Sequence, residues 1–358
     1  MGRPMNVDIP AGWQDALRGV VERGGVCMVI GGVDAGKTTF CGVLAARALE
    51  KGIKVALVDA DPGQSDIGPP AAVGMAIINS AQQLGELESV PADALSFVGT
   101  TTPAGHLLQL AVAACDMVTH ARAAGVELVI VDTTGLVNGG IARALKSAKV
   151  DLLRPRHVVA LQRKDEVEHL LAPYRRRAQP EIHRLAPSRL AKPRDRDERK
   201  AKRERQFGAY FAGAAEHDLA WDDVALEQTL WLSGKPVPGH IAAYVEELVE
   251  AQILYAERIE TGIFAIVKGL ERAAHRSVKG DELDVRAVDV GLLGNLLVGL
   301  MGASGRTLAM GILSRVDFKQ RRFLIRAPAP SIEGLRSLRL GSMRVGLDGA
   351  ELGHGEIA

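Results

Sequence analysis

The sequence predicts an α/β fold, in which a parallel sheet flanked by helices is followed by a β-rich C-terminal domain. Four short runs are apolar throughout, at residues 26–30, 55–58, 128–131 and 158–161. Strands of this kind indicate a parallel sheet that is buried on both faces. Stretches of helical character lie between the runs, at residues 38–49 and 107–124. Because strands alternate with helices in parallel α/β sheets, the order along the chain indicates the same fold.

The chain beyond residue 220 shows a different pattern. Runs punctuated by Gly and Pro predict strands at 262–268, 287–293, 297–300, 307–315, 322–327 and 338–346. Many short strands bounded by turn residues are typical of β-rich domains. We therefore expect two domains, one over residues 1–220 and a β-rich one over residues 221–358.

The composition is that of a globular protein. The chain has 358 residues, of which 47% are hydrophobic and 24% are charged, and these values exclude a disordered or collagen-like chain. No apolar run approaches the roughly 20 residues of a spanning helix, and the N-terminus lacks the pattern of a secretory leader. We therefore expect a cytoplasmic protein without membrane contact. The cysteines lack metal-ligand spacing and are expected to be buried apolar residues: Cys27, Cys41 and Cys115.

Positive charge is concentrated in one segment. The whole chain has a formal net charge of +1, but residues 151–210 contain 17 Lys and Arg against 9 Asp and Glu. Such a block predicts an anion-binding surface. Four prolines and few apolar residues over 172–205 favour a mobile excursion, which becomes helical over 195–211. The alternative is a solvated charged helix with i,i+4 pairs such as Glu198–Lys202.

A phosphate-binding motif follows the first apolar run. The segment Gly31-Gly32-Val33-Asp34-Ala35-Gly36-Lys37-Thr38 satisfies the P-loop pattern G-x-x-x-x-G-K-[ST] between a predicted strand and a predicted helix. Its backbone N–H groups and the helix N-terminus are suited to phosphate oxygens. Lys37 is expected to bridge the β- and γ-phosphates, Thr38 to bind Mg²⁺, and Thr39 to hydrogen-bond the α-phosphate. The alternative is a chance glycine-rich turn.

Carboxylates follow the next two predicted strands. Asp59 and Asp61 end the second strand, and Asp132 ends the third, at the Walker B position, where it is expected to bind the metal. The carboxyl ends of parallel strands are where ligands bind in such sheets. One carboxylate after the second strand is suited to orient Mg²⁺, and the other to accept a proton from an attacking hydroxyl. The alternative is a solvated strand end followed by an Asp-Pro-Gly turn.

A polar loop precedes the helix predicted at 107–124. It contains Thr101, Thr102 and His106, whose side chains are suited to bind a substrate phosphate or base. The alternative for the hydroxyls is helix capping by Thr102, with Pro103 at the first helical position. His106 is equally well explained as a surface residue.

A missing motif argues against one class of P-loop protein, the GTPases. A GTPase would need N/T-K-x-D after the fourth strand to read guanine, but this place holds Gln162-Arg163-Lys164-Asp165, with no residue between Lys and Asp. The guanine code is therefore not met.

The combined motifs resemble those of the P-loop polynucleotide 5′-hydroxyl kinases, the family of RNA kinases that act in mRNA 3′-end processing, tRNA splicing and pre-rRNA processing. The resemblance rests on the segments 31–39, 59–64, 99–106, 132–137, 207–211, 297–300 and 312–318. Asp-x-Asp-x-Gly-Gln followed by Gly-Thr-Thr-Thr-Pro is more discriminating than the P-loop alone. The resemblance therefore covers most of the chain.

The family resemblance implies roles for individual residues. Lys37 and Thr38 match the Walker A lysine and the metal-binding hydroxyl. Asp61 matches the carboxylate proposed to activate the 5′-hydroxyl. Asp59 matches the neighbouring carboxylate, which lies on the metal side. The remaining matches are substrate-facing: Gln64 in the same turn, Thr102 in the substrate clasp loop, and Arg194 and Arg199 in the lid. The lid is expected at about residues 172–211, and Arg189, Arg196 and Arg203 are alternatives for its arginines.

The implied function is Mg²⁺-dependent transfer of the γ-phosphate of ATP to the 5′-hydroxyl of RNA, with DNA ends as a further acceptor. Aromatic residues make up only 4% of the chain, and the three tryptophans are expected in the core, which predicts weak base-specific readout. Only about 25 residues precede the first strand, so we expect a compact, free-standing enzyme without the N-terminal β-domain of some relatives. The alternatives are a regulatory P-loop ATPase and an ATP-binding scaffold without turnover.

Overall fold

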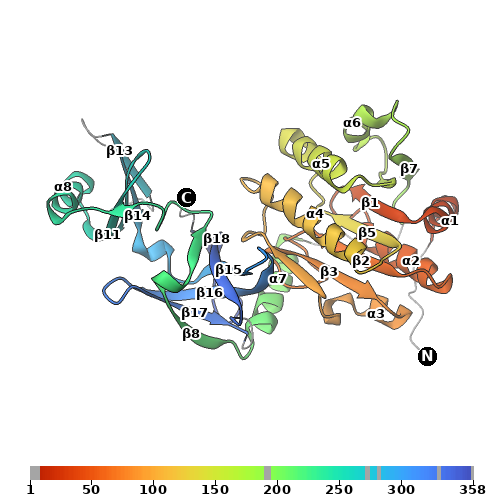
Figure 1. Ribbon diagram of the computed structural model, residues 1–358. Helices are drawn as coiled ribbons and strands as arrows, with labels where there is room; N and C mark the ends of the chain where they lie inside the picture. Colours follow the sequence, from red (N-terminus) through yellow and green to blue (C-terminus); the bar gives the residue numbers. More distant parts are fainter. Residues whose placement is uncertain (1–8, 189–194, 271–274, 280–283, 329–331, 356–358) are drawn as a thin grey trace. The chain divides into compact units, whose positions relative to one another are not determined.

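The chain forms two compact units, which are described separately. The computed structural model describes residues 9–188, 195–270, 275–279, 284–328 and 332–355 (Figure 1). Unit 1 comprises residues 1–203 and unit 2 comprises residues 204–358. A division into domains at residue 220 stays a prediction. The strand β8 (Ala215–Ala220), on the N-terminal side of that division, pairs with a strand of unit 2.

Unit 1 is built on a seven-stranded sheet with the order β4-β3-β2-β5-β1-β6-β7. The strands are β1 (Gly25–Gly31), β2 (Val55–Ala60), β3 (Ala72–Ile78), β4 (Ala94–Phe97), β5 (Leu128–Thr133), β6 (His157–Leu161) and β7 (Glu181–Leu185). The expected strands at 26–30, 55–58, 128–131 and 158–161 are confirmed, and they pair in parallel. The sheet is mixed rather than parallel throughout, because β3 and β4 add antiparallel to one edge.

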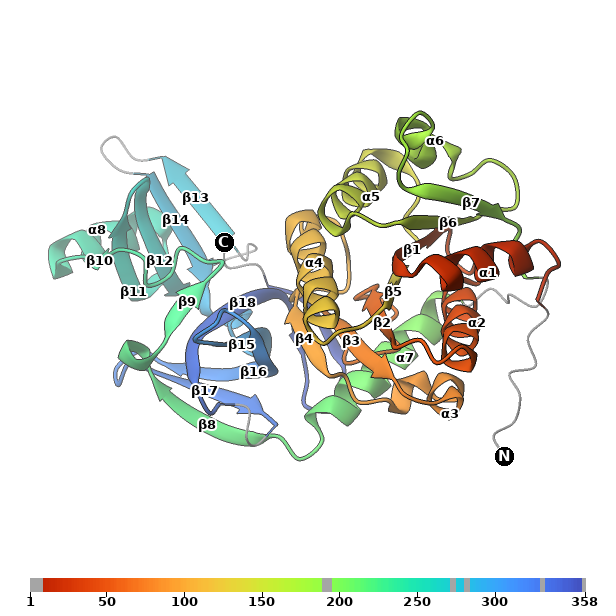
Figure 2. The same ribbon diagram turned by 45° about the vertical axis from the view of Figure 1, so that its right-hand side comes forward.

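Helices cover both faces of this sheet (Figure 2). Residues of α4 and α5 pack on one face, and residues of α1 and α2 pack on the other. Successive residues of β1 alternate between the two clusters, which explains why this strand is apolar throughout. The helices are α1 (Trp13–Arg23), α2 (Lys37–Glu50), α3 (Ala81–Gly85), η1 (Leu87–Ser89), α4 (Leu107–Ala123), α5 (Gly139–Leu153), α6 (Glu168–Leu171) and η2 (Ala172–Tyr174).

The segment expected to be a mobile excursion contains a strand. Residues 181–185 form β7, which pairs in parallel with β6 at the edge of the sheet. The prediction was wrong here because β7 lies at an edge and has a largely polar sequence, Glu-Ile-His-Arg-Leu. The expected helix over 195–211 is confirmed as α7 (Arg196–Phe211), whose first half lies in unit 1.

Over its described residues, unit 2 contains two sheets, the second half of α7 and the helix α8 (Gly239–Val249). The sheets have the orders β10-β11-β12-β14-β13 and β19-β18-β15-β16-β17-β8, with β9 beside β18. Their other members are β9 (Ala225–Glu227), β10 (Lys235–Pro236), β11 (Gln252–Ile259), β12 (Gly262–Lys268), β13 (His275–Lys279), β14 (Asp284–Asp289), β15 (Leu296–Gly302), β16 (Thr307–Asp317), β17 (Arg322–Ala327), β18 (Leu335–Val345) and β19 (Glu351–His354), with turns η3 (Trp221–Asp223) and η4 (Val290–Leu292). Five of the six expected strands are confirmed. The strand expected at 287–293 ends at Asp289, where η4 begins.

The expected core residues can be checked directly. Trp13, Trp221 and Trp231 are all buried, as predicted. Trp221 and Trp231 pack edge to face with ring centroids 5.4 Å apart. Cys27 and Cys41 are buried as expected, whereas Cys115 is only half-buried. Among the described residues, no helix is both long and apolar enough to cross a membrane.

Candidate active site

The P-loop lies where β1 ends and α2 begins. Asp34 and Gly36 have φ angles of +54° and +81°, so the loop turns through left-handed backbone that suits glycine at position 36. A Cβ on Gly31 would lie 2.8 Å from the Leu161 carbonyl oxygen, so only glycine lets β1 approach β6 here. A Cβ on Gly135 would lie 2.8 Å from Val33 Cα. The loop after β5 therefore rests directly against the P-loop.

Lys37 is the first residue of α2 and is largely buried. Its Nζ donates to the carbonyl oxygen of Gly32 within the P-loop, at 2.9 Å. The ammonium is thus held over the loop whose N–H groups are expected to bind phosphates. This places the charge of Lys37 next to the predicted phosphate site.

Two of the predicted metal ligands are in contact. The Thr38 hydroxyl donates to Asp132 Oδ2 at 2.5 Å, and Asp132 Oδ1 is buried with no hydrogen-bond partner among the described residues. Asp59 of β2 is the register partner of Asp132 in β5. These three residues and Asp66 form the polar part of the lining of a cavity of about 10 Å³, whose other lining residues are apolar. Such a volume holds about one water-sized occupant.

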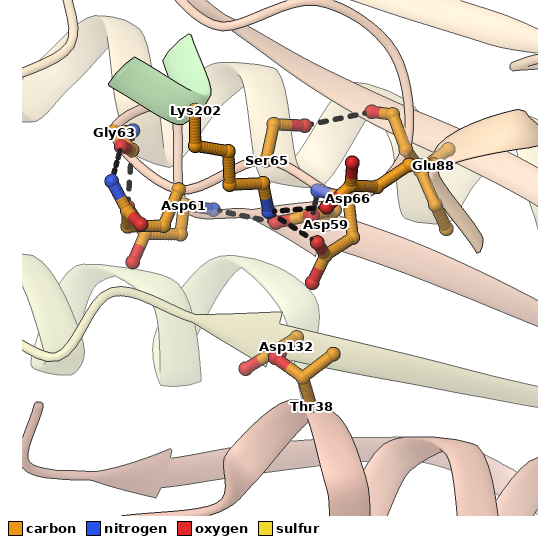
Figure 3. Close-up of polar contacts among 11 residues, drawn as sticks. Thr38, Asp59, Asp61, Gly63, Ser65, Asp66, Glu88, Asp132 and Lys202 are labelled. Atoms are coloured by element: carbon orange, nitrogen blue, oxygen red, sulfur yellow. Dashed lines mark hydrogen bonds and ion pairs between the residues drawn. The ribbon is translucent and has the colours of Figure 1, made fainter. Parts of the chain in front are cut away.

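The turn after β2 is closed by the Asp59 side chain (Figure 3). The Asp59 carboxylate accepts from the backbone N–H of Asp61, at 3.1 Å, and from that of Asp66. Asp61 in turn accepts from the N–H of Gly63 at 3.1 Å. The two carboxylates therefore diverge as the strand ends. Asp59 faces the buried turn, and Asp61 is half-buried.

Burial and mutual repulsion raise the pKa values of the carboxyl groups at this edge. The pKa of Asp132 is raised to about 6, mainly by burial, although Lys37 and the Thr38 hydroxyl lower it. Burial also raises the pKa of Asp59, and Asp66 and Asp132 raise it further. Charged oxygens held close together in a buried place are stabilised when a cation binds between them.

This donor set fits Mg²⁺. The metal prefers oxygen ligands and is commonly held by one or two carboxylates together with substrate phosphates and water. Thr38, Asp59 and Asp132 supply such oxygens, and the unpartnered Asp132 Oδ1 offers a buried acceptor without a donor in the described chain. The observed residues are therefore suited to the predicted metal.

The loop before α4 lies against the turn after β2. A Cβ on Gly63 would lie 2.6 Å from the Thr101 carbonyl oxygen, so the two segments are in close contact. This contact places the turn that carries Gln64 beside the loop that carries Thr101 and Thr102. Gln64 Nε2 donates to the carbonyl oxygen of Gly63.

The capping interpretation of Thr102 is wrong. Helix α4 begins at Leu107, its N-cap is His106, and no side chain caps it. The N–H of Thr102 instead donates to the buried Thr100 hydroxyl, at 3.3 Å. His106 is half-buried, and its Nδ1 lies 3.1 Å from the Ala104 carbonyl oxygen.

The start of α7 contacts the site through two basic side chains. Arg199 Nη2 lies 2.7 Å from Asp34 Oδ2 in the P-loop. Lys202 is 5% exposed and pairs with Asp66 and, at 3.2 Å, with Glu88 (Figure 3). These contacts exclude the solvated i,i+4 pair expected for Lys202 in the alternative interpretation. Arg194 and its alternative Arg189 lie outside the described residues.

Three lysines were missed as site residues. Besides Lys202, they are Lys146 and Lys149 of α5, both buried. Lys146 Nζ donates to Thr133 Oγ1 and to the Thr134 carbonyl oxygen, each at 2.7 Å, and Lys149 Nζ donates to the Ala60 carbonyl oxygen at 3.1 Å. Burial lowers both pKa values, that of Lys149 to about 8. Together they brace the ends of β5 and β2.

Known proteins share this chain's sequence and fold. Residues 31–213 match the family model of the mRNA cleavage and polyadenylation factor CLP1 P-loop. A polyribonucleotide 5′-hydroxyl-kinase of Pyrococcus furiosus is 31% identical over 98% of this chain and 96% of its own length. A second relative with this description, from Methanocaldococcus jannaschii, is 30% identical over 91% of this chain and 88% of its own length.

A solved structure agrees on the fold. Clp1p, in its wild-type complex with Pcf11p, superposes with a TM-score of 0.60 over 93% of this chain and 78% of that chain. Its sequence identity is 14%, so this likeness concerns the fold alone. The family match spans the P-loop, both carboxylate strand ends and α7. From this match and the nearly full-length relatives, we conclude that the chain belongs to the CLP1 P-loop family.

Proposed function

We propose that this protein is an ATP-dependent polynucleotide kinase, which transfers the γ-phosphate of ATP to the 5′-hydroxyl of RNA. The observation that carries the proposal is the similarity to polyribonucleotide 5′-hydroxyl-kinases over nearly the whole chain. The site agrees with this chemistry, because the P-loop, the neighbouring carboxylates of Asp59 and Asp132, and the Asp61 carboxylate all lie at the carboxyl ends of β1, β2 and β5. We propose DNA ends as a further acceptor.

The P-loop side of the site binds the donor. Backbone N–H groups of residues 31–39 hold the phosphates, and the Lys37 ammonium moves from the Gly32 carbonyl to the β- and γ-phosphate oxygens. Thr38, Asp59 and Asp132 would hold Mg²⁺, which would neutralise charge on the phosphates. Phosphoryl transfer depends mainly on such positioning and charge stabilisation.

Asp61 serves as the proton acceptor for the 5′-hydroxyl. Its carboxylate is tied to the Gly63 N–H, which fixes the side chain at the mouth of the turn. The neighbouring Asp59 is committed to two backbone N–H groups and to the metal side, so the two carboxylates have separate tasks. Thr101, Thr102, Gln64 and His106 line the acceptor side.

The lid arginines stabilise the negative charge of the phosphoryl group during its transfer. Arg199 forms an ion pair with Asp34 of the P-loop. From this position its guanidinium can move to a phosphate oxygen. Arg194 is proposed for the same task. A lid that excludes water favours transfer to an alcohol over hydrolysis.

The deciding experiment is transfer from γ-labelled ATP to matched oligonucleotides with Mg²⁺. The substrates are one RNA with a 5′-hydroxyl, the same RNA with a 5′-phosphate, and the DNA of the same sequence. We expect label on the 5′-hydroxyl RNA and none on the phosphorylated RNA. Lys37→Ala should abolish the label.

The other outcomes decide between alternatives. ATP consumed without labelled oligonucleotide would contradict the proposal and favour a regulatory ATPase. ATP bound without turnover would favour a scaffold. Label on RNA but not on DNA would retain the kinase and remove DNA as an acceptor.

A further inference from the structure

A second polar cluster lies in unit 1 where the strands β6 and β7 begin. His157 is the first residue of β6, and Glu181 and His183 lie in β7, which pairs with β6 so that His157 is the partner of Glu181. Residues i and i+2 of a strand point to the same face, which brings the two β7 side chains together. The P-loop follows the carboxyl end of β1, whereas this cluster is at the amino ends of β6 and β7.

The ligand atoms of this cluster have the spacing of a metal site. His157 Nδ1 lies 3.2 Å from His183 Nε2, and these atoms lie 3.7 and 3.8 Å from the Glu181 carboxylate oxygens. Ligands of a tetrahedral zinc ion, at 2.0–2.1 Å from it, lie roughly 3.4 Å apart. Among the described residues, this is the one group of three His, Cys, Asp or Glu whose ligand atoms all lie within 4.8 Å of one another.

The surroundings prepare the side chains for a cation. His157 is fully buried, and burial lowers its pKa to about 4, with a further contribution from His183. The pKa of His183 is also lowered by burial. Neutral imidazole is the form of histidine that binds metal. Arg23 Nη2 lies 2.9 Å from the Glu181 carboxylate, a position suited to orient a ligating carboxylate from outside.

We propose that His157, Glu181 and His183 form a binding site for one divalent transition-metal ion of the zinc type. Two imidazoles and one carboxylate, with water as the fourth ligand, are a known zinc donor set. The ion would fasten the edge strand β7 to β6, just before the chain continues toward α7. The role assigned to the ion here is to join β6 and β7, and it takes no part in the chemistry at the P-loop.

The test is metal binding by the full chain after chelator treatment and dialysis. Zn²⁺ is titrated by calorimetry, and Co²⁺ by its visible absorption, which reports tetrahedral coordination. We expect one tight Zn²⁺ site, a tetrahedral Co²⁺ spectrum and an increase in Tm with Zn²⁺. His183→Ala should weaken Zn²⁺ binding by at least about 100-fold, because even loss of an outer partner costs 10- to 100-fold.

Three variants control the interpretation. Glu181→Gln preserves the side-chain shape and should also weaken binding. His240→Ala removes an exposed histidine of α8 and should change nothing. Asp132→Asn should still bind Zn²⁺ tightly. If this variant lost tight Zn²⁺ binding, the metal would be assigned to the P-loop side and the proposal would be overturned. Equal Zn²⁺ affinity in wild type and His183→Ala would also overturn it and leave a hydrogen-bonded histidine pair. Unfolding curves without metal confirm that each variant is folded.

Discussion

Asp61 is the residue on which the acceptor chemistry depends. We expect Asp61→Asn to lower kcat for RNA by about 10²–10⁴-fold, which is the usual contribution of a general base to the rate. The Kd for ATP should stay unchanged. The amide oxygen can still accept from the Gly63 N–H, so the turn should persist. Transfer kinetics and ATP titration provide the two measurements. Asp165→Asn, an exposed carboxylate on the same unit, serves as control. Normal transfer by Asp61→Asn would remove Asp61 as the proton acceptor.

Asp132 is expected to reduce stability in the absence of metal. Its pKa of about 6 in the folded chain, set mainly by burial, exceeds the value near 4 of an unfolded chain. The folded state therefore binds this proton more tightly, and stability is lost as the pH rises between about 4 and 6. Asp132→Asn should stabilise the metal-free protein at pH 7 by on the order of 1–2 kcal/mol and abolish transfer.

Denaturant unfolding in a chelator at pH 4 and pH 7 measures this effect. The stability difference between Asp132→Asn and wild type should nearly vanish at pH 4. An equal difference at both pH values would contradict the assignment of the cost to the ionised carboxylate. Added Mg²⁺ should stabilise wild type at pH 7 and leave the variant unchanged.

At the scale of elements, the lid is expected to act on turnover. Because an arginine that stabilises the transferring phosphoryl group is worth about 10³–10⁵ in rate, Arg194→Ala/Arg199→Ala should lower kcat by about 10³-fold or more. ATP affinity should change far less. The matched double variant Arg18→Ala/Arg47→Ala removes two exposed arginines from α1 and α2. Unchanged turnover in the lid variant would remove the lid assignment.

Helix α7 also anchors the turn after β2. Lys202 pairs with Asp66, whose N–H donates to Asp59, so the helix and the metal-side carboxylate are connected. Although burial lowers it, the pKa of Lys202 is raised by Asp66 and Glu88, which keeps the ammonium charged. We expect Lys202→Met to lower kcat and to destabilise the protein by about 1–3 kcal/mol, because Asp66 loses a buried partner.

Kinetics and denaturant unfolding check this prediction together. Lys200→Met, which removes an exposed ammonium from the same helix, is the control. A loss of stability without any change in kcat would make Lys202 a purely structural residue.

Elements could be predicted where burial or a motif dictates the sequence. The strands β1, β2, β5 and β6 each contain a continuous apolar run because each is covered on both faces, and α2 follows a P-loop. Edge strand β7 was missed because one of its sides is unpaired, so it carries charged side chains that resemble a loop. The antiparallel addition of β3 and β4 depends on pairing across the sheet, which composition does not encode.

The site could be predicted in part for the same reason. The P-loop and strand-end carboxylates are local patterns. Lys146 and Lys149 share the buried stripe of α5 with Ala142 and Leu145, and two lysines in such a stripe are a signal that was available in the sequence. The pairing of Lys202 with Asp66 joins residues 136 positions apart, so only the folded chain reveals it.

For the whole molecule, charge is divided unevenly along the chain. The net charge is +1 overall, yet residues 151–210 carry an excess of eight positive charges, so the remainder is acidic. We expect RNA binding to weaken steeply with salt, because basic side chains release counterions from the backbone. In Arg194→Ala/Arg199→Ala, the slope of log K against log salt should fall by roughly 0.7 for each RNA phosphate that the variant no longer neutralises. An unchanged slope would place RNA elsewhere on the molecule.

The Asp59 carboxylate closes the turn at residues 61–66, and this closure restricts which sequence changes the turn can accept. Asp59 holds two backbone N–H groups that are five residues apart, so the length of the turn is tied to the chemistry. Replacing Gln64 alters what the turn presents to an acceptor but keeps both donors in place. Inserting or deleting a residue displaces one of them. New acceptor preferences are therefore accessible by substitution within this turn and closed to changes in its length.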